Sequence, residues 1–203
     1  MLSVRGRAPI RPVVEPIAAA LLRVGISPNT VTLVGTVVSV LLAVILIPTN
    51  HLFAAAVSIA IFTAFDLLDG TMARLRGRGT KYGATLDASC DRITDAALFG
   101  AIAYWVVYHH GADSVLLILT LITMGSSQVI SYVKARAEAS GLKVNGGLVE
   151  RAERLIIGLI GVGLQGLGVD YALYVAMWLL AIGSVFTVCL LYTSPSPRDA
   201  TLS

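Results

Sequence analysis

Long apolar stretches separated by short polar segments run through most of the chain. Six of them approach or exceed the length of about 20 residues that crosses a bilayer, and they fall at residues 30–48, 52–74, 84–108, 114–133, 154–169 and 171–191. Before the first stretch, residues 10–24 interleave apolar side chains with Arg11, Glu15 and Arg23, a pattern typical of an amphipathic helix on a membrane surface. We therefore expect an all-α integral membrane protein with six transmembrane helices preceded by an amphipathic juxtamembrane helix.

The composition agrees with this pattern. The chain has 203 residues, of which 56% are hydrophobic and 13% charged, and its mean hydropathy is +0.82. These values are far from those of a soluble globular domain and are typical of a polytopic membrane protein. No internal repeat or second domain is apparent, so residues 1–188 form one predicted domain. We expect no nucleic-acid partner.

The basic residues divide the connecting segments into two classes. The segments near residues 49–51, 109–113 and 168–170 contain no Lys or Arg. The amino terminus and the two other turns carry the charge, and their basic residues are Arg5, Arg7, Arg11, Arg23, Arg74, Arg76, Arg78, Lys81, Arg92, Lys134, Arg136, Lys143, Arg151 and Arg154. By the positive-inside rule, both termini and these two turns face the cytoplasm.

Four aspartates stand at the cytoplasmic ends of the second and third predicted spans. Asp66 and Asp69 are three residues apart, and Asp87 and Asp91 are four apart, so on helices each pair occupies one face. Carboxylates at a membrane are costly and usually functional. Two such faces turned toward each other would form a cage that a divalent cation neutralises, and oxygen ligands suit magnesium, manganese or calcium.

The turn between the two pairs is basic and contains glycine. A carboxylate-held metal beside arginines is suited to binding a pyrophosphate group. Gly70 and Ala73 leave the helix face next to the metal without bulk, so a ligand could approach the backbone there. The alternative is that Asp66 and Asp69 only pair with Arg74 and its neighbouring arginines at the interface.

The sequence Asp66-x-x-Asp69-Gly70-x-x-Ala73-Arg74, followed by Gly83-x-x-x-Asp87-x-x-x-Asp91, resembles the motif of the CDP-alcohol phosphatidyltransferases. The resemblance implies a six-span homodimer that displaces CMP from a CDP-linked lipid by an alcohol. It implies two Mg²⁺ or Mn²⁺ ions held by the four aspartates, with Asp91 also accepting the proton of the attacking hydroxyl group.

The resemblance also implies a binding site for CDP-diacylglycerol. Gly70, Arg74 and Thr80 would contact its CDP group, next to the small residue Ala73. The segment at the start of the first span resembles the stretch that borders this site in the family, and it comprises Asn29, Thr30, Val31 and Thr32 after Pro28.

A cluster of basic residues near the fourth turn indicates which alcohol is used. Lys134, Arg136, Arg151 and Arg154 lie at facing helix ends near the depth of the aspartates, which suggests an acceptor with its own phosphate group. Residues 10–188 resemble the actinobacterial branch of the family, which joins CDP-diacylglycerol to inositol 1-phosphate and makes phosphatidylinositol phosphate. That resemblance implies that Lys134, Arg151 and an arginine late in the sixth span hold the acceptor phosphate. Glycerol 3-phosphate is the alternative acceptor, as in a phosphatidylglycerophosphate synthase.

The last fifteen residues depart from this pattern. The family pattern predicts an arginine near position 191, where this chain has Leu191, and the following Ser194-Pro195-Ser196-Pro197 run has no helical periodicity. Residues 189–203 resemble the translation of a sequencing-library adapter, so we expect a non-native tail and a truncated sixth helix.

Two hypotheses from other classes stay open at this point. The four aspartates could form the transport site of a divalent-cation transporter, although such sites usually lie at the bilayer midplane rather than at helix ends. They could also serve only as interface ion pairs in a structural membrane subunit. For the enzyme, the expected location is the plasma membrane of a bacterium, with the active site on the cytoplasmic side.

Overall fold

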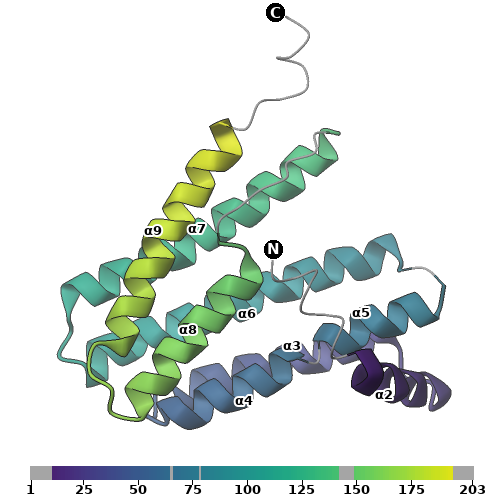
Figure 1. The fold of residues 1–203 in the computed structure, drawn as a ribbon, viewed down its shortest axis with the longest axis horizontal. Coiled ribbons are helices and arrows are strands. Elements are labelled where there is room, and N and C mark those ends of the chain that lie inside the picture. The colour runs from purple at the N-terminus through teal and green to yellow at the C-terminus, as the bar shows by residue number, and fades with distance from the viewer. Residues whose placement is uncertain (1–10, 65, 78, 142–148, 194–203) are drawn as a thin grey trace, which may run out of the picture.

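The computed structural model describes residues 11–64, 66–77, 79–141 and 149–193, and for residues 11–13, 64, 66 and 67 it describes the backbone alone. All regular secondary structure in these residues is helical (Figure 1). The helices are α2 (Arg11–Arg23), α3 (Pro28–Leu46), α4 (Leu52–Ala64), α5 (Asp66–Leu75), α6 (Lys81–His109), α7 (Ser114–Ala139), α8 (Arg151–Gly166) and α9 (Ala172–Thr193).

These helices coincide with the predicted elements. α2 is the predicted amphipathic helix, α4 and α5 together cover the second predicted span, and each of the other five spans corresponds to one helix. Ser27 caps the start of α3, because its hydroxyl accepts a hydrogen bond from the Thr30 N–H at 3.2 Å.

Four helical stretches in the described residues are long and apolar enough to cross a membrane, namely Pro28–Leu46, Leu52–Leu75, Ser114–Ala139 and Ala172–Thr193. The all-α membrane character is therefore confirmed. α6 is longer than any of these four stretches, but charged side chains in its first half make it less apolar. α8 has only 16 residues, which is short for a membrane span. The six-span topology depends on these two helices and stays a prediction.

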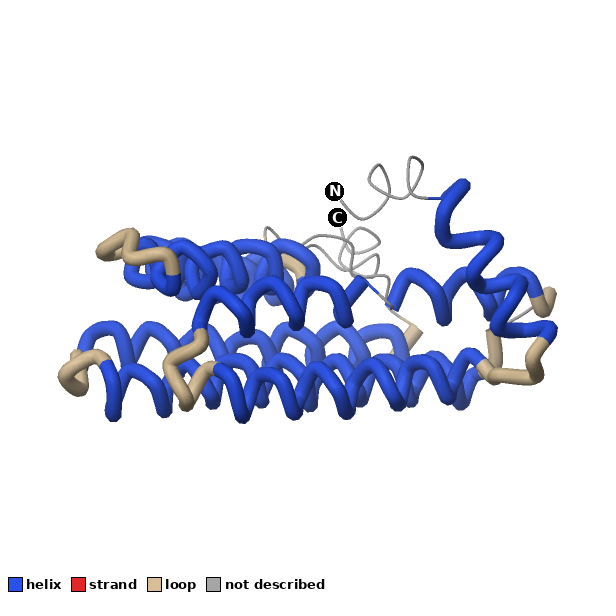
Figure 2. The backbone as a smooth tube through the Cα atoms, turned by 90° about the horizontal axis from the view of Figure 1, so that it is seen from below, coloured by secondary structure: helices blue, strands red, loops and turns tan. Residues whose placement is uncertain are grey.

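Six helices form a closed ring. Its order is α3, α4, α8, α9, α7 and α6, with each helix packed against the next and α6 packed back against α3. Figure 1 shows α3, α4 and α6 running in similar directions, with α8 and α9 inclined more steeply. Figure 2 shows α2 at an angle to the long helices at one end. The ring brings α8 close to helices that are distant from it in the sequence.

Small residues on α8 allow this packing. A Cβ atom at Gly161 would lie 2.5 Å from the Cβ of Ala176 on α9, and one at Gly163 would lie 3.2 Å from the Cβ of Ala56 on α4. Since real Cβ atoms essentially never approach within 3.0 Å, Gly161 is needed where α8 meets α9. Close helix contacts through small residues are typical of membrane bundles.

α2 packs against α5, the helix that carries the first aspartate pair. Ala18 is fully buried there against Leu68 and Met72. The amphipathic helix therefore supports the segment from which Asp66 and Asp69 arise.

Candidate active site

One helix carries a line of functional positions. Gly83, Asp87, Asp91 and Asp95 follow one another at intervals of four residues on α6. Each interval rises about 6 Å along the helix and turns slightly past one full revolution. The four positions therefore form a gently spiralling stripe that leads from the start of α6 into the bundle.

The start of α3 connects α6 with the other aspartate helix. The hydroxyl of Thr32 on α3 donates a hydrogen bond to the Asp69 carboxylate on α5, and both side chains are buried. A Cβ atom at Gly83 would lie 3.1 Å from the side-chain oxygens of both Asn29 and Thr80. The segment predicted to border the CDP-lipid site therefore lies against Asp69 on α5 and against the start of α6, one turn before Asp87.

The aspartate side chains have the right chemistry to bind a divalent metal ion, but the cage of four aspartates stays a prediction. Among the described side chains, no three of His, Cys, Asp and Glu lie close enough together to hold a metal ion, and the Asp66 side chain falls outside them. The donors are carboxylate oxygens, which suit hard divalent cations. A Cβ atom at Gly70 would meet no described heavy atom within 4 Å, so there is open space beside Asp69.

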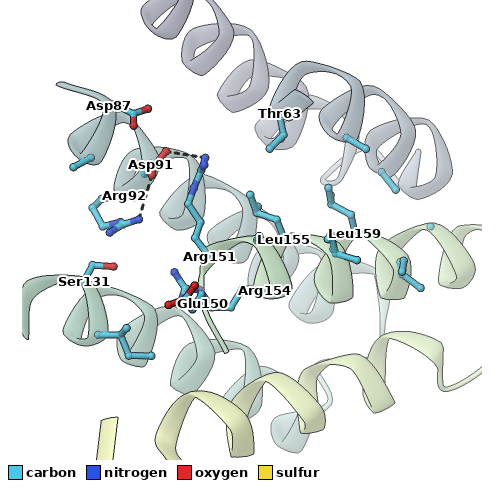
Figure 3. Close-up of a pocket in the computed structure, with 18 of the residues that line it drawn as sticks. Thr63, Asp87, Asp91, Arg92, Ser131, Glu150, Arg151, Arg154, Leu155 and Leu159 are labelled. Atoms are coloured by element: carbon cyan, nitrogen blue, oxygen red, sulfur yellow. Dashed lines mark ion pairs between the residues drawn. The ribbon is translucent and has the colours of Figure 1, made fainter. Parts of the chain in front are cut away.

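A cavity of about 1140 Å³ opens between α4, α6, α7 and α8 (Figure 3). Its apolar part lies between α4 and α8, where the lining includes Phe53, Val57, Leu155, Leu159, Ile160 and Leu164. Its polar part is lined by Asp87, Asp91, Arg92, Ser131, Lys134, Glu138, Glu150, Arg151 and Arg154. The cavity therefore joins an apolar surface to a charged end.

Ion pairs organise the charged end. Asp91 Oδ1 lies 2.9 Å from Arg151 Nη2, and Asp91 Oδ2 lies 3.6 Å from Arg92 Nη2 (Figure 3). Lys134 Nζ donates to Glu150 Oε1 at 2.9 Å. This hydrogen bond lowers the pKa of Glu150 below its usual value, although partial burial opposes the shift. The predicted base and two predicted phosphate ligands thus line the same cavity.

The basic cluster predicted for the acceptor phosphate is only partly brought together. Lys134, Arg151 and Arg154 line the cavity, but Arg136 is exposed and lies outside its lining. Arg154 is almost completely buried, and its Nη2 lies 3.0 Å from Asp95 Oδ2. The structure therefore brings Lys134, Arg151 and Arg154 to one cavity and leaves Arg136, two residues after Lys134 on α7, outside it. Binding of the acceptor phosphate by these residues stays a prediction.

The end of α9 lies outside the cavity lining. Leu191 is buried within the last turn of α9, and no residue of α9 lines the cavity. The helix continues to Thr193, whereas residues 194–203 of the predicted non-native tail lie outside the described residues.

Comparison with known proteins identifies the family to which this chain belongs. The family model described as CDP-alcohol phosphatidyltransferase matches residues 25–189. The chain is 55% identical to a phosphatidylinositol phosphate synthase of Corynebacterium glutamicum over 188 residues, which cover 93% of this chain and 86% of that protein. It is 51% identical to the protein of the same name from Mycobacteroides abscessus, with 92% of this chain and 87% of that protein covered.

Solved structures show the same fold. The crystal structure of Mycobacterium tuberculosis phosphatidylinositol phosphate synthase with CDP-DAG bound matches with a TM-score of 0.86 at 50% identity, over 92% of this chain and 96% of that one. The structure of that enzyme in complex with manganese and citrate matches with a TM-score of 0.85, again at 50% identity, over 91% of this chain and 90% of that one. The chain belongs to the CDP-alcohol phosphatidyltransferase family.

Proposed function

We propose that this protein transfers the phosphatidyl group of CDP-diacylglycerol to inositol 1-phosphate, giving phosphatidylinositol phosphate and CMP. The observation that carries the proposal is the shared cavity of Asp91, Arg151 and Lys134, next to the aspartate motif of the family. A base beside two cations suits an acceptor with one hydroxyl to activate and one phosphate to hold. The relatives named phosphatidylinositol phosphate synthase support this choice over glycerol 3-phosphate.

Two different surfaces are proposed to bind the CDP-lipid, one for its CDP group and one for its acyl chains. Asn29 to Thr32, Gly70, Ala73, Arg74 and Thr80 are proposed to bind its CDP group. Thr80 caps α6 by accepting a hydrogen bond from the Gly83 N–H at 2.9 Å, so its hydroxyl oxygen is fixed at the start of that helix. The acyl chains are proposed to follow the apolar part of the cavity between α4 and α8.

We place two Mg²⁺ or Mn²⁺ ions among Asp66, Asp69, Asp87 and Asp91. When bound, such ions neutralise charge on phosphoryl oxygens and on the departing CMP. The manganese complex of the Mycobacterium tuberculosis enzyme supports the choice of metal class.

The chain's own side chains supply the remaining chemistry. The acceptor's hydroxyl oxygen forms a bond to the phosphorus that carries diacylglycerol, the bond from that phosphorus to CMP breaks, and Asp91 accepts the hydroxyl proton. Arg151 and Lys134 bind the acceptor's phosphate and so orient its hydroxyl toward that phosphorus. The four-residue spacing on α6 places Asp87 one turn from the base Asp91.

The proposed setting is the plasma membrane of a bacterium. α6 and α8 complete six spans, both termini face the cytoplasm, and the charged end of the cavity opens on that side, because the basic residues concentrate there. The family resemblance supports a homodimer.

The reaction class is tested by CMP release from CDP-diacylglycerol in detergent, with inositol 1-phosphate present. We expect release that stops when EDTA removes divalent metal and returns when Mg²⁺ or Mn²⁺ is added. A cation transporter or a structural subunit with the same aspartates would release no CMP under any of these conditions.

Thr32 is expected to act on Asp69 through its hydrogen bond. Thr32→Val keeps the shape of the side chain but removes the donor, whereas Thr32→Ser keeps the donor. Since hydrogen bonds to metal ligands typically contribute about 10- to 100-fold in metal affinity, we expect Thr32→Val to raise the dissociation constant for Mn²⁺, measured by electron paramagnetic resonance, about tenfold or more. Thr32→Ser should remain close to the unsubstituted protein. Equal Mn²⁺ affinity in both variants would show that Thr32 does not orient Asp69.

A further inference from the structure

A second pair of opposite charges lies deeper in the bundle than Asp91 and Arg151. Asp95 on α6 has 0% of its side chain exposed and Arg154 on α8 has 1%. Arg154 is the largest fully buried side chain in the described part of the protein. Ionisable groups inside a membrane protein are costly and are usually retained for function.

Stability alone does not account for this pair. Nη2 of Arg154 contacts Oδ2 of Asp95, while Nε and Nη1 of Arg154 and Oδ1 of Asp95 have no hydrogen-bond partner in the described part of the chain. A buried ion pair offsets its desolvation only when its remaining donors and acceptors are satisfied, and apolar residues of similar volume are often as stable or more stable. The role of the Asp95–Arg154 pair must therefore lie in the groups whose positions it fixes.

The two ion pairs form parallel connections between the same helices. Asp91 and Asp95 are four residues apart on α6, and Arg151 and Arg154 are three apart on α8, so each set lies on one helical face. The outer connection, Asp91–Arg151, consists of groups proposed to engage the reactants. The inner connection, Asp95–Arg154, lies about one helical turn farther along both helices.

The start of α8 is also held by α9. The Val149 N–H donates to Thr187 Oγ1 at 3.1 Å, and a Cβ atom at Gly183 would lie 2.5 Å from a Val149 methyl carbon. Val149 thus fixes the segment before α8 against α9, whereas Asp95–Arg154 fixes the first turn of α8 against α6. Arg151 lies between these two points of attachment.

We propose that Asp95 and Arg154 are positioning residues that tie the first turn of α8 to α6 across the bundle and so hold Arg151 at the acceptor-phosphate site. Arg151 exchanges part of its contact with Asp91 for the incoming phosphate. Because the inner ion pair does not take part in this exchange, the first turn of α8 keeps its position relative to α6 while it happens. This inference rests on the proposed function and deepens it, since neither residue needs to touch either substrate.

The decisive variant replaces both partners, as Asp95→Leu together with Arg154→Leu. We expect its thermal unfolding midpoint to stay near that of the unsubstituted protein, because no buried charge is left without a partner. The acceptor KM should rise roughly tenfold or more, because small displacements of a binding group weaken its effect strongly. The KM for CDP-diacylglycerol should change less than about twofold.

Three single variants keep the test decisive if the double variant does not fold. Asp95→Asn preserves shape and should raise the acceptor KM, and Arg154→Lys preserves the charge and should raise it less than Arg154→Leu does. A folded double variant with an unchanged acceptor KM, or equal increases in KM for both substrates in Asp95→Asn, would overturn the inference. The unsubstituted protein is assayed in parallel, and its failure to use inositol 1-phosphate would contradict the proposed function instead.

Discussion

Asp91→Asn is expected to reduce kcat by about 100- to 10,000-fold, the range that a positioned general base contributes. Asparagine has nearly the same shape as aspartate but cannot accept the hydroxyl proton. It also removes the negative charge that lies 2.9 Å from Arg151 Nη2. The measurement is CMP release at saturating concentrations of both substrates, together with the equilibrium affinity for CDP-diacylglycerol, which should be largely retained.

Asp170→Asn provides a matched control for this substitution. Asp170 is exposed between α8 and α9, and the same change of aspartate to asparagine there should leave kcat unaltered. Near-normal turnover in Asp91→Asn would contradict its role as the base. Loss of CDP-lipid affinity in parallel with turnover would instead indicate that Asp91 mainly supports the metal site.

The second large effect is expected at the acceptor. Arg151→Ala and Lys134→Ala should each raise the acceptor KM roughly tenfold to more than a hundredfold, because a hydrogen bond to a charged group contributes about 1.5–3 kcal/mol. The KM for CDP-diacylglycerol should stay nearly constant, since both side chains lie at the charged end of the cavity. Arg151→Lys should have an intermediate effect, because a lysine keeps the charge but lacks the planar fork that binds two phosphate oxygens.

Arg23→Ala controls for the loss of a positive charge outside the cavity. Arg23 is an exposed residue in the last turn of α2, and its removal should change neither KM. If Lys134→Ala and Arg151→Ala raised both KM values equally, the two cations would support the fold rather than bind the acceptor.

The periodicity of apolar residues was sufficient to predict the helices, because each lipid-facing or core-facing face must be apolar over the whole span. It predicted α3, α7 and α9 closely. It could not predict the closed ring of helices, since the contacts of α8 with α4 and α9 depend on shape rather than on sequence spacing.

The part of the candidate site that carries the aspartate motif could be predicted from the sequence. The role of a charged residue outside the motif could not, because it depends on whether the side chain is buried. The spacing of Asp87 and Asp91 predicted that both lie on one helical face, and the structure shows both in the lining of one cavity. Arg154 could not be distinguished by sequence from Lys134, since only the packed structure shows that Asp95 contacts it. One signal for Asp95 was present, because it continues the four-residue spacing of Asp91 into a predicted span, where an isolated carboxylate would be costly.

The acceptor panel tests the central claim most directly. CMP release from CDP-diacylglycerol is measured with inositol 1-phosphate, free inositol and glycerol 3-phosphate in parallel, and the lipid product is identified by mass spectrometry. Since a site built for a charged group strongly rejects analogues that lack it, we predict phosphatidylinositol phosphate as the product, with kcat/KM at least about 100-fold higher for inositol 1-phosphate than for free inositol. Equal use of free inositol, or a preference for glycerol 3-phosphate, would contradict the proposed function.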